Sequence, residues 1–285
     1  MAGGYSHPSA VNDMDFMNLD STGNAIDFGN TSSNQYYAAG FGSRTHGFTA
    51  GKSPASNTVS RWVFASTGTF ADYSDLSQDR KEAAAASNST RAVIMGGERS
   101  DIEFITMSST ASGNNFGNLS LGSSTRYSNG CGNSTRGLIY IGNLHPSGNA
   151  SDVIEYVTIS TLGDASDFSD YSGGQGDGPM SCANAVRSIR AGGGFPAGSV
   201  TIDFITISTL GNSLDFGDLT LARYSAEGLA SPTRAVFAGG AAHPSYYNNI
   251  DYVQFASTGD ATDFGDLVVA RNYLSGATNG HGGLG

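Results

Sequence analysis

The fold is decided by residues 233–267, which read TRAVFAGGAAHPSYYNNIDYVQFASTGDAT and then DFGDL. The pattern occurs six times in 285 residues, and the apolar residue that opens its IDYV-type strand serves as an anchor. Successive anchors are 45, 43, 52, 48 and 48 residues apart. The anchors are Met14, Val59, Ile102, Ile154, Ile202 and Ile250. A period of 20–50 residues is typical of solenoids and propellers, and the copies predict a single domain over residues 1–285.

Each repeat carries about four short strand signals. In the last full repeat they cover residues 224–230, 235–238, 250–256 and 263–269. The third of these alternates apolar and polar residues in most copies, as a half-buried strand does. The glycine content, 40 of 285 residues, suits many tight turns. The sequence therefore predicts an all-β propeller of six four-stranded blades.

The two ends of the chain match each other across one repeat. Residues 1–9 (MAGGYSHPS) align without gaps on residues 237–245 (FAGGAAHPS). Counting on from Asp263 brings Gly285 to the register of Met1. A linear solenoid would need capped ends, whereas a ring can join its termini and remove exposed strand edges. The alignment predicts that N- and C-terminal strands share one blade.

The repeats resemble kelch repeats. The hydrophobic strand that ends in Gly-Gly matches at 235–240 (AVFAGG) and 92–97 (AVIMGG), and the following kelch strand matches NNIDYVQF at 248–255. The amino-acid pattern of the repeats also resembles that of kelch-like, tail-associated virion proteins of marine bacteriophages. This resemblance implies a propeller over nearly the whole chain and a structural or attachment role in a virion.

An aromatic residue follows each anchor by fourteen positions, and an acidic or amide residue precedes it. The aromatics are Phe28, Tyr73, Phe116, Phe168, Phe216 and Phe264. They could form a stacking platform, but one large ring per repeat favours a blade-to-blade core. The preceding Asp or Asn could be a metal ligand, but a turn that hydrogen-bonds its own backbone is favoured.

A second set of repeated residues is charged. Arg91, Arg136, Arg187 and Arg234, with His46 in the remaining copy, begin the Gly-Gly strands. An acidic set lies on the next strand, at Asp15, Glu103, Glu155, Asp203 and Asp251. The arginines could bind an anion in a channel. The favoured hypothesis is an ion-pair or hydrogen-bond lattice between the two sets.

No catalytic constellation is visible. Cys131 and Cys182 share a register with Phe41, Ala86, Leu229 and Ala277, which predicts buried, unbridged thiols on the innermost strand. No His/Cys spacing typical of zinc and no calcium loop is present. We therefore expect no enzyme activity, no cofactor and no metal.

The variable part of each repeat is the loop after the Gly-Gly strand. Three of these loops contain His-Pro-Ser, and variable loops on a rigid scaffold are where recognition usually occurs. The candidate binding residues are Tyr5, His7, His145, His243, Tyr246 and Tyr247. Tyrosine rings suit contact with sugars or proteins. Two alternatives stay open: His-Pro-Ser is only turn chemistry, or the three histidines converge on one metal.

Charge and composition indicate which classes of partner this protein does not bind. The net charge is −11, with 14 Lys and Arg against 25 Asp and Glu, which argues against nucleic acid. The start of the chain has no basic-then-apolar signal peptide, and no apolar run is long enough for membrane insertion. The insert at 172–180 is expected to be a surface loop. We expect a non-enzymatic virion protein, made in the host cytoplasm, that contacts other virion proteins or a host surface glycan. The alternative is a cellular lectin-like or scaffolding propeller.

Overall fold

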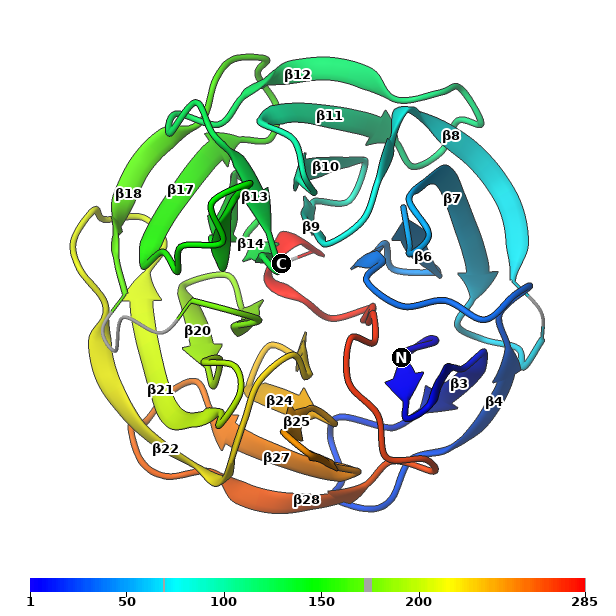
Figure 1. The fold of residues 1–285 in the computed structure, drawn as a ribbon, viewed down its shortest axis with the longest axis vertical. Helices are drawn as coiled ribbons and strands as arrows, with labels where there is room; N and C mark the ends of the chain where they lie inside the picture. The colour runs from blue at the N-terminus through cyan, green and yellow to red at the C-terminus, as the bar shows by residue number, and fades with distance from the viewer. Residues whose placement is uncertain (69, 172–175, 285) are drawn as a thin grey trace.

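The structure, a computed structural model, describes residues 1–68, 70–171 and 176–284, so that part of the predicted insert at 172–180 lies outside the described residues. It is an all-β propeller whose sheets surround a central axis (Figure 1). Five sheets have four strands each. The first two are β5 (Ala39–Gly42), β6 (His46–Ala50), β7 (Ser56–Val63), β8 (Ala71–Arg80), and β9 (Ala83–Ser87), β10 (Arg91–Gly96), β11 (Asp101–Thr106), β12 (Asn114–Asn118). The third and fourth are β14 (Asn129–Gly132), β15 (Arg136–Tyr140), β17 (Val153–Thr158), β18 (Ser166–Asp170), and β19 (Met180–Ala183), β20 (Arg187–Ala191), β21 (Ser199–Thr206), β22 (Leu214–Arg223). The fifth is β23 (Glu227–Ala230), β24 (Arg234–Ala238), β27 (Asn249–Gln254) and β28 (Thr262–Asp266).

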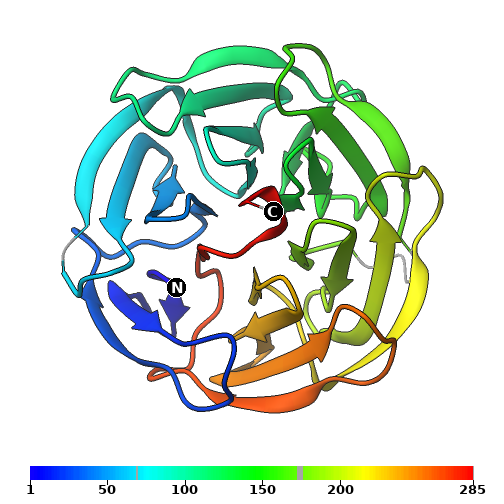
Figure 2. The same ribbon diagram turned by 180° about the vertical axis from the view of Figure 1, so that it is seen from behind.

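The predicted number of blades is wrong, because five blades are complete and not six. At the sixth position the sheet has only two strands, β3 (Asp13–Phe16) and β4 (Ile26–Asn30). Residues 1–2 and 274–278 lie on its inner side, and we call these four segments the terminal sector. Among the described residues, single β-bridges from Ala2 to Met14 and from Ala2 to Ser275 connect the inner segments of the sector to β3 and to each other. The sector follows β28 around the ring and precedes β5 (Figure 2).

The terminal sector differs from a complete blade at the register of β24. Met1 and Ala2 occupy the register of Phe237 and Ala238, the last two residues of β24. The three earlier positions of that strand have no counterpart in the terminal sector. Residues 274–278 therefore find only Ala2 as a ladder partner, and they do not form a regular strand.

The repeated aromatics form the core between blades, as predicted. All six are buried, with Phe216 and Phe264 the most enclosed. Each lies on an outer strand, beside a kink that the register shift in the β-ladder produces, for example between Ile250 and Asp251. The Asp or Asn before each aromatic is exposed, and the Asp27 carboxylate accepts the Gly29 N–H at 2.9 Å.

The predicted pairing of the two charged sets is wrong. Arg187 instead donates to the carbonyl oxygen of Phe255 in the next blade, at 2.6 Å, and its guanidinium lies over the Phe204 ring. Arg91, Arg136 and Arg234 make the same two kinds of contact. Side chains on one strand alternate between the two faces of the sheet. The arginines and the carboxylates lie on opposite faces, with the arginines near solvent and the carboxylates in the blade interface, so they do not meet.

Three of the five buried carboxylates pair with an arginine from the preceding blade, whereas Asp203 pairs with Arg190 of its own sheet. Glu155 instead accepts hydrogen bonds from Ser120 and Leu121 of the preceding blade. Asp251 lies 3.1 Å from Arg223, and neither side chain is exposed to solvent. Asp251 also accepts the N–H and hydroxyl of Thr220. Glu103 pairs in the same way with Arg80, and Asp15 with Arg271. Each of these three ion pairs joins a blade to its neighbour through groups that are removed from water.

The axial channel is lined by the inner strands and is blocked by the C-terminal segment. The register of Phe41, Ala86, Cys131, Cys182, Leu229 and Ala277 lines it, as predicted. Both cysteines are free; Cys182 is buried and Cys131 half-buried. The 3₁₀ turn η1 (Gly282–Leu284) lies at one end of the channel, where His281 Nε2 is 2.9 Å from the carbonyl oxygen of Gly42.

Candidate functional site

The opposite end of the channel carries one residue from each repeat in the same unusual backbone conformation. Each has a φ between 51° and 70°, and each lies one or two residues before an inner strand or directly before residues 274–278. We call this set the axial ring: Tyr37, Glu82, Tyr127, Gly178, Ser225 and Tyr273. A left-handed φ is unusual for residues with a Cβ. The same left-handed conformation therefore recurs six times around this end of the channel.

The axial ring is held together by backbone hydrogen bonds that run around the axis. The N–H of Tyr37 donates to the carbonyl of Tyr273, at 3.1 Å, and the N–H of Tyr273 donates to Ser225, at 2.8 Å. Glu82 donates likewise to Tyr37, Gly178 to Tyr127 and Ser225 to Gly178. The left-handed turn thus directs five of the six N–H groups toward the previous member of the set, and these bonds connect neighbouring inner strands near their first residues.

Aromatic side chains extend from the axial ring across this face of the disc. The rings of Tyr37 and Tyr273 are 4.2 Å apart between centroids, and Tyr127 lies 5.6 Å from Tyr37. Tyr36 lies 4.7 Å from Tyr37 and 5.7 Å from Tyr5. On the other side Tyr273 contacts Tyr224, which contacts Phe195. We call the connected set the aromatic face: Tyr5, His7, Tyr36, Tyr37, Tyr127, Phe195, Tyr224, Tyr246 and Tyr273.

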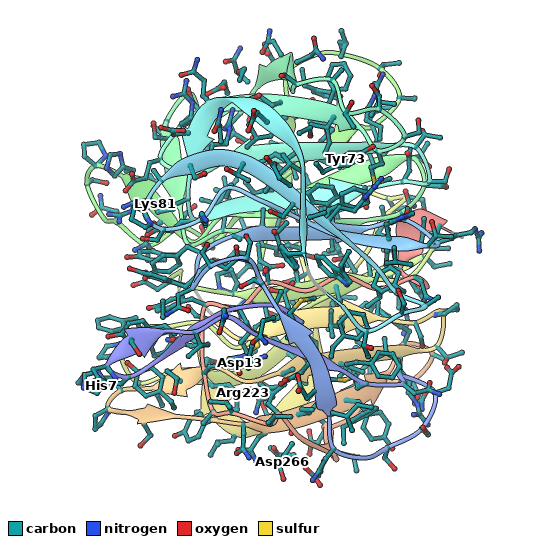
Figure 3. All side chains as sticks on the ribbon, turned by 90° about the vertical axis from the view of Figure 1, so that its right-hand side faces the viewer. His7, Asp13, Tyr73, Lys81, Arg223 and Asp266 are labelled. Carbon is teal, nitrogen blue, oxygen red and sulfur yellow. The ribbon has the colours of Figure 1, made fainter. Side chains whose placement is uncertain are left out.

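Three of the six residues predicted for binding belong to this surface. Tyr5 (β1, Tyr5–Ser6, paired with β2, Ser9–Ala10) and Tyr246 (β26, Ser245–Tyr246, paired with β25, Ala241–Ala242) lie on two neighbouring hairpins. His7 stacks on Tyr246 with centroids 6.3 Å apart, and Tyr5 lies 6.1 Å from Tyr246. His7 projects from one face of the disc when the molecule is seen from the side (Figure 3).

The other three predicted residues are not part of the aromatic set. His145 ends β16 (Asn143–His145), which pairs with β13 (Ser124–Arg126) on another blade. His243 is at the tip of the β25–β26 hairpin, and its N–H donates to Pro196. Tyr247 follows that hairpin, and its backbone bonds Gly240 and Arg271. The histidines thus occupy separate hairpin tips, and no group of three or more His, Cys, Asp or Glu in the described ranges could hold a metal ion.

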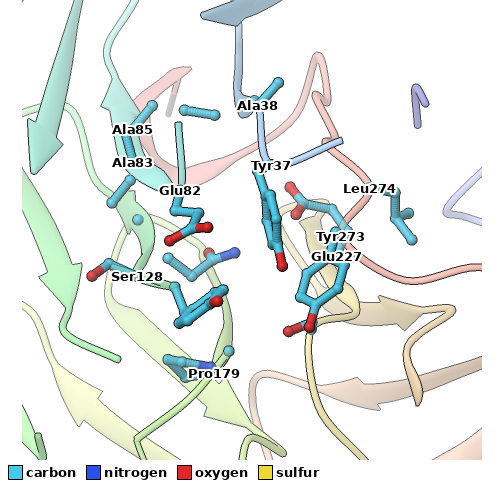
Figure 4. A pocket seen from close by; sticks show the side chains of 18 of the residues that line it. Tyr37, Ala38, Glu82, Ala83, Ala85, Ser128, Pro179, Glu227, Tyr273 and Leu274 are labelled. Atoms are coloured by element: carbon cyan, nitrogen blue, oxygen red, sulfur yellow. The ribbon is translucent and has the colours of Figure 1, made fainter. Parts of the chain in front are cut away.

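A small cavity lies beneath the tyrosines, between the inner strands. Its volume is about 60 Å³, and its walls include Tyr37, Glu82, Tyr127, Glu227 and Tyr273 (Figure 4). A water molecule needs roughly 10–15 Å³ of such space. The cavity therefore fits a few waters and not a sugar ring, so a larger ligand would rest on the tyrosines above it.

Glu227 is the most strongly perturbed carboxyl group of this region. Burial raises its pKa to about 8, although the Gly276 N–H and the charge of the Met1 amino group favour the ionised form. The Gly276 N–H donates to its Oε1 at 2.9 Å. Near neutral pH the group therefore holds its proton much of the time, and the cavity is less negative than its residues suggest.

Polar groups around the tyrosines are already paired with one another. Arg126 donates to the Glu82 carboxylate at 2.7 Å and also contacts Glu98. The Asn143 amide donates to Asp177 at 2.7 Å. Burial raises the pKa of Glu82, Asp177 and Tyr127. The face thus offers ring surfaces and dipoles, with its charges largely compensated.

The axial ring escaped sequence analysis because its conformation repeats while its side chains do not. Tyr, Glu, Tyr, Gly, Ser and Tyr share no chemistry. A signal did exist: each position lies four residues before the inward register that includes Phe41, Cys131 and Ala277. Tyrosines at three of six such positions could have indicated an aromatic cluster on the axis.

No helix in the described part of the chain is long and apolar enough to span a membrane. No protein-family model and no curated protein sequence matches the chain. Among solved structures, the chain is similar to one described as the structure of YjhT, with a TM-score of 0.68 and 11% sequence identity. The alignment covers 88% of this chain and 90% of that one. At this identity the likeness shows the fold alone, and the fold it shows is a β-propeller.

Proposed function

We propose that this protein is a non-enzymatic attachment protein of a phage virion, which binds a neutral surface glycan through the aromatic face. The observation that supports the binding role is the unbroken series of ring contacts from His7 and Tyr5, through Tyr36 and Tyr37, to Tyr273 and Phe195. Most of these rings are half-buried, so each keeps one surface against the protein and another toward solvent.

The chemistry of the face favours a neutral ligand. Tyrosines offer large, rigid, amphipathic surfaces whose ordering costs little entropy. The net charge of −11 disfavours a polyanion. Arg126, the cation nearest the tyrosines, already bonds Glu82. Pyranose rings, whose apolar faces can stack on tyrosines while their hydroxyls reach water, fit this combination.

The binding role is tested with an array of neutral and acidic oligosaccharides, followed by calorimetry on the best neutral ligand. Tyr36→Ala should weaken binding by roughly tenfold, as expected for loss of one aromatic contact. Leu210→Ala is the matched control, because Leu210 is exposed but lies in the turn between β21 and β22. Equal affinity of both variants, or binding only to acidic glycans, would overturn the proposal.

The virion role rests on the repeat resemblance and is tested separately. Purified particles of the source phage should contain the protein at a fixed ratio to other virion proteins. Its absence from particles, together with retained glycan binding, would favour the alternative of a cellular lectin-like propeller. Its presence without glycan binding would leave a structural protein whose loops contact other virion subunits.

A further inference from the structure

A second site lies in the terminal sector, where the ring lacks a piece of strand. A cavity of about 580 Å³ opens there, roughly ten times the size of the cavity beneath the tyrosines. One wall is formed by Phe16, Met17 and Asn18, at the end of β3. The opposite wall is formed by Ala277, Thr278 and Asn279. One wall thus follows β3, which is paired with β4, and the other follows Ser275, which is bridged to Ala2.

The complete blades show what occupies the same place. In the fifth blade, Val236, Ala235 and Arg234 of β24 pair with Tyr252, Val253 and Gln254 of β27. On the other side, Val236 and Ala235 pair with Leu229 and Ala230 of β23. The counterparts of these partners in the terminal sector are Phe16, Met17 and Asn18, and Ala277 and Thr278. The cavity thus lies where residues equivalent to Arg234, Ala235 and Val236 would pair. It is flanked by the backbone of residues 16–18 on one side and of residues 277–278 on the other.

The ends of this space also match the contacts of a strand that begins with arginine. Arg234 lies over the ring of Tyr252, 4.9 Å from its centroid, and donates to Leu19 at 3.0 Å. The corresponding ring and carbonyl for an incoming strand belong to Phe16 and Phe64. Phe64 lines the cavity, and Phe16 is 43% exposed, whereas the arginine-covered rings of the other blades are less exposed.

The walls between these ends are apolar. Met14, Phe28 and Trp62 contribute side chains to the cavity and belong to one buried cluster. Trp62 replaces the smaller Ile105, Val157, Ile205 and Val253 of the other blades. An apolar cavity of this size costs stability until it is filled, and an aliphatic side chain would fill it.

We propose that the terminal sector binds an extended segment of a partner polypeptide, in which an arginine is followed by a small and then a β-branched residue. The segment adds a short strand between β3 and residues 277–278, as in other cases of β-strand addition. Its arginine covers Phe16 and donates to the carbonyl of Phe64. Its two following residues pair with both edges and place the β-branched side chain against Met14 and Trp62.

The test uses the full chain and the peptide Ser-Pro-Thr-Arg-Ala-Val, the sequence of residues 231–236. Trp62 is the only tryptophan of the chain and lines the cavity, so its fluorescence reports occupancy directly. Saturable change in Trp62 emission is expected, together with a higher melting temperature at saturating peptide. A control peptide with proline in place of the alanine should give neither effect, because proline cannot donate the ladder hydrogen bond.

Phe16→Ala tests the arginine contact and should weaken peptide binding roughly two- to fivefold. Phe16 is exposed, so this variant should fold, and its own melting curve checks this. Equal responses to both peptides would show a nonspecific apolar cavity and overturn the proposal. No response to either would do the same. Emission that changes with protein concentration alone, with dimers in sedimentation, would show that a second copy is the occupant instead.

Discussion

Tyr37 and Tyr273 meet twice: the N–H of Tyr37 donates to the carbonyl of Tyr273, and their rings lie 4.2 Å apart between centroids. Tyr37 precedes the innermost strand of the first complete blade, and Tyr273 precedes the last inner segment of the chain. One pair therefore links the first and last members of the axial ring through the backbone and also forms the centre of the aromatic face. Architecture and candidate recognition surface depend on the same two residues.

Replacement of Ser225 by glycine should stabilise the protein. Ser225 has a φ of 52° in the axial ring, where Gly178 already occupies the equivalent position. Relief of the left-handed conformation is worth about 0.5–1 kcal/mol, and the denaturant midpoint should rise accordingly. Ser225→Ala is the control, since it removes the hydroxyl but keeps the Cβ. A midpoint that rises equally in both variants would locate the strain in the hydroxyl instead.

Loss of the Asp251 carboxylate should destabilise the fold strongly. Arg223 would remain fully buried without its anionic partner, at a cost of about 3–5 kcal/mol. Asp251→Ala is compared with Asp263→Ala in thermal or denaturant unfolding. Asp263 is paired opposite Asp251 in the β27–β28 ladder but is exposed, so its loss should change stability by less than about 0.5 kcal/mol. Similar losses of unfolding free energy in the two variants would contradict a stabilising role of the Asp251–Arg223 ion pair between blades.

Arg187 should stabilise the blade interface in a way that salt does not remove. Its acceptor is the neutral carbonyl of Phe255, and its guanidinium lies 4.8 Å from the Phe204 centroid. Arg187→Met should cost about 1–3 kcal/mol. The cost should be nearly the same at about 0.05 M and about 1 M NaCl, because both contacts are to neutral groups, which salt does not screen. A cost that falls steeply with salt would restore the ion-pair lattice expected from the sequence.

Glu227 should make stability depend on pH between about 5 and about 8. Burial raises its pKa from 4.5 to about 8, so in this range the folded state binds more protons than the unfolded state. The contribution of Glu227 is therefore present below pH 4.5 and is lost as the pH rises through 8. The difference in unfolding free energy between wild type and Glu227→Gln should decrease as pH increases.

The comparison of wild type with Glu227→Gln is needed because the Met1 amino group makes stability increase with pH, opposite to Glu227. Burial lowers the pKa of its amino group from 8.0 to about 6, so its contribution increases as pH rises between those values. Both proteins contain Met1, and subtraction largely removes its effect. A difference that stays flat or increases with pH would show that Glu227 is ionised in the folded protein.

The sequence predicted what depends on repeated side chains. The anchors from Met14 to Ile250 begin or lie in the third strands, and the aromatic at each +14 position is buried. Lys81 to Ala86 has helical propensity, yet Ala83–Ser87 forms β9, because its register in the repeat decides its structure.

What the sequence could not predict depends on neighbours in space. Counting anchors gave six repeats but not the number of strands in each, and only Ala2 connects residues 274–278 to β3. The partner of Asp251 was wrong because Arg223 reaches it from the preceding blade. The aromatic face was only partly found, at Tyr5, His7 and Tyr246, because Tyr37, Tyr127 and Tyr273 share a backbone conformation and not a motif.

The C-terminal segment has a further consequence for how the molecule can work. His281 and η1 occupy one mouth of the axis, and Tyr37, Tyr127 and Tyr273 converge over the other. Both ends of the axis are thus covered by different residues of the same chain. A ligand-binding surface on one side and an assembly contact on the other could therefore be altered independently.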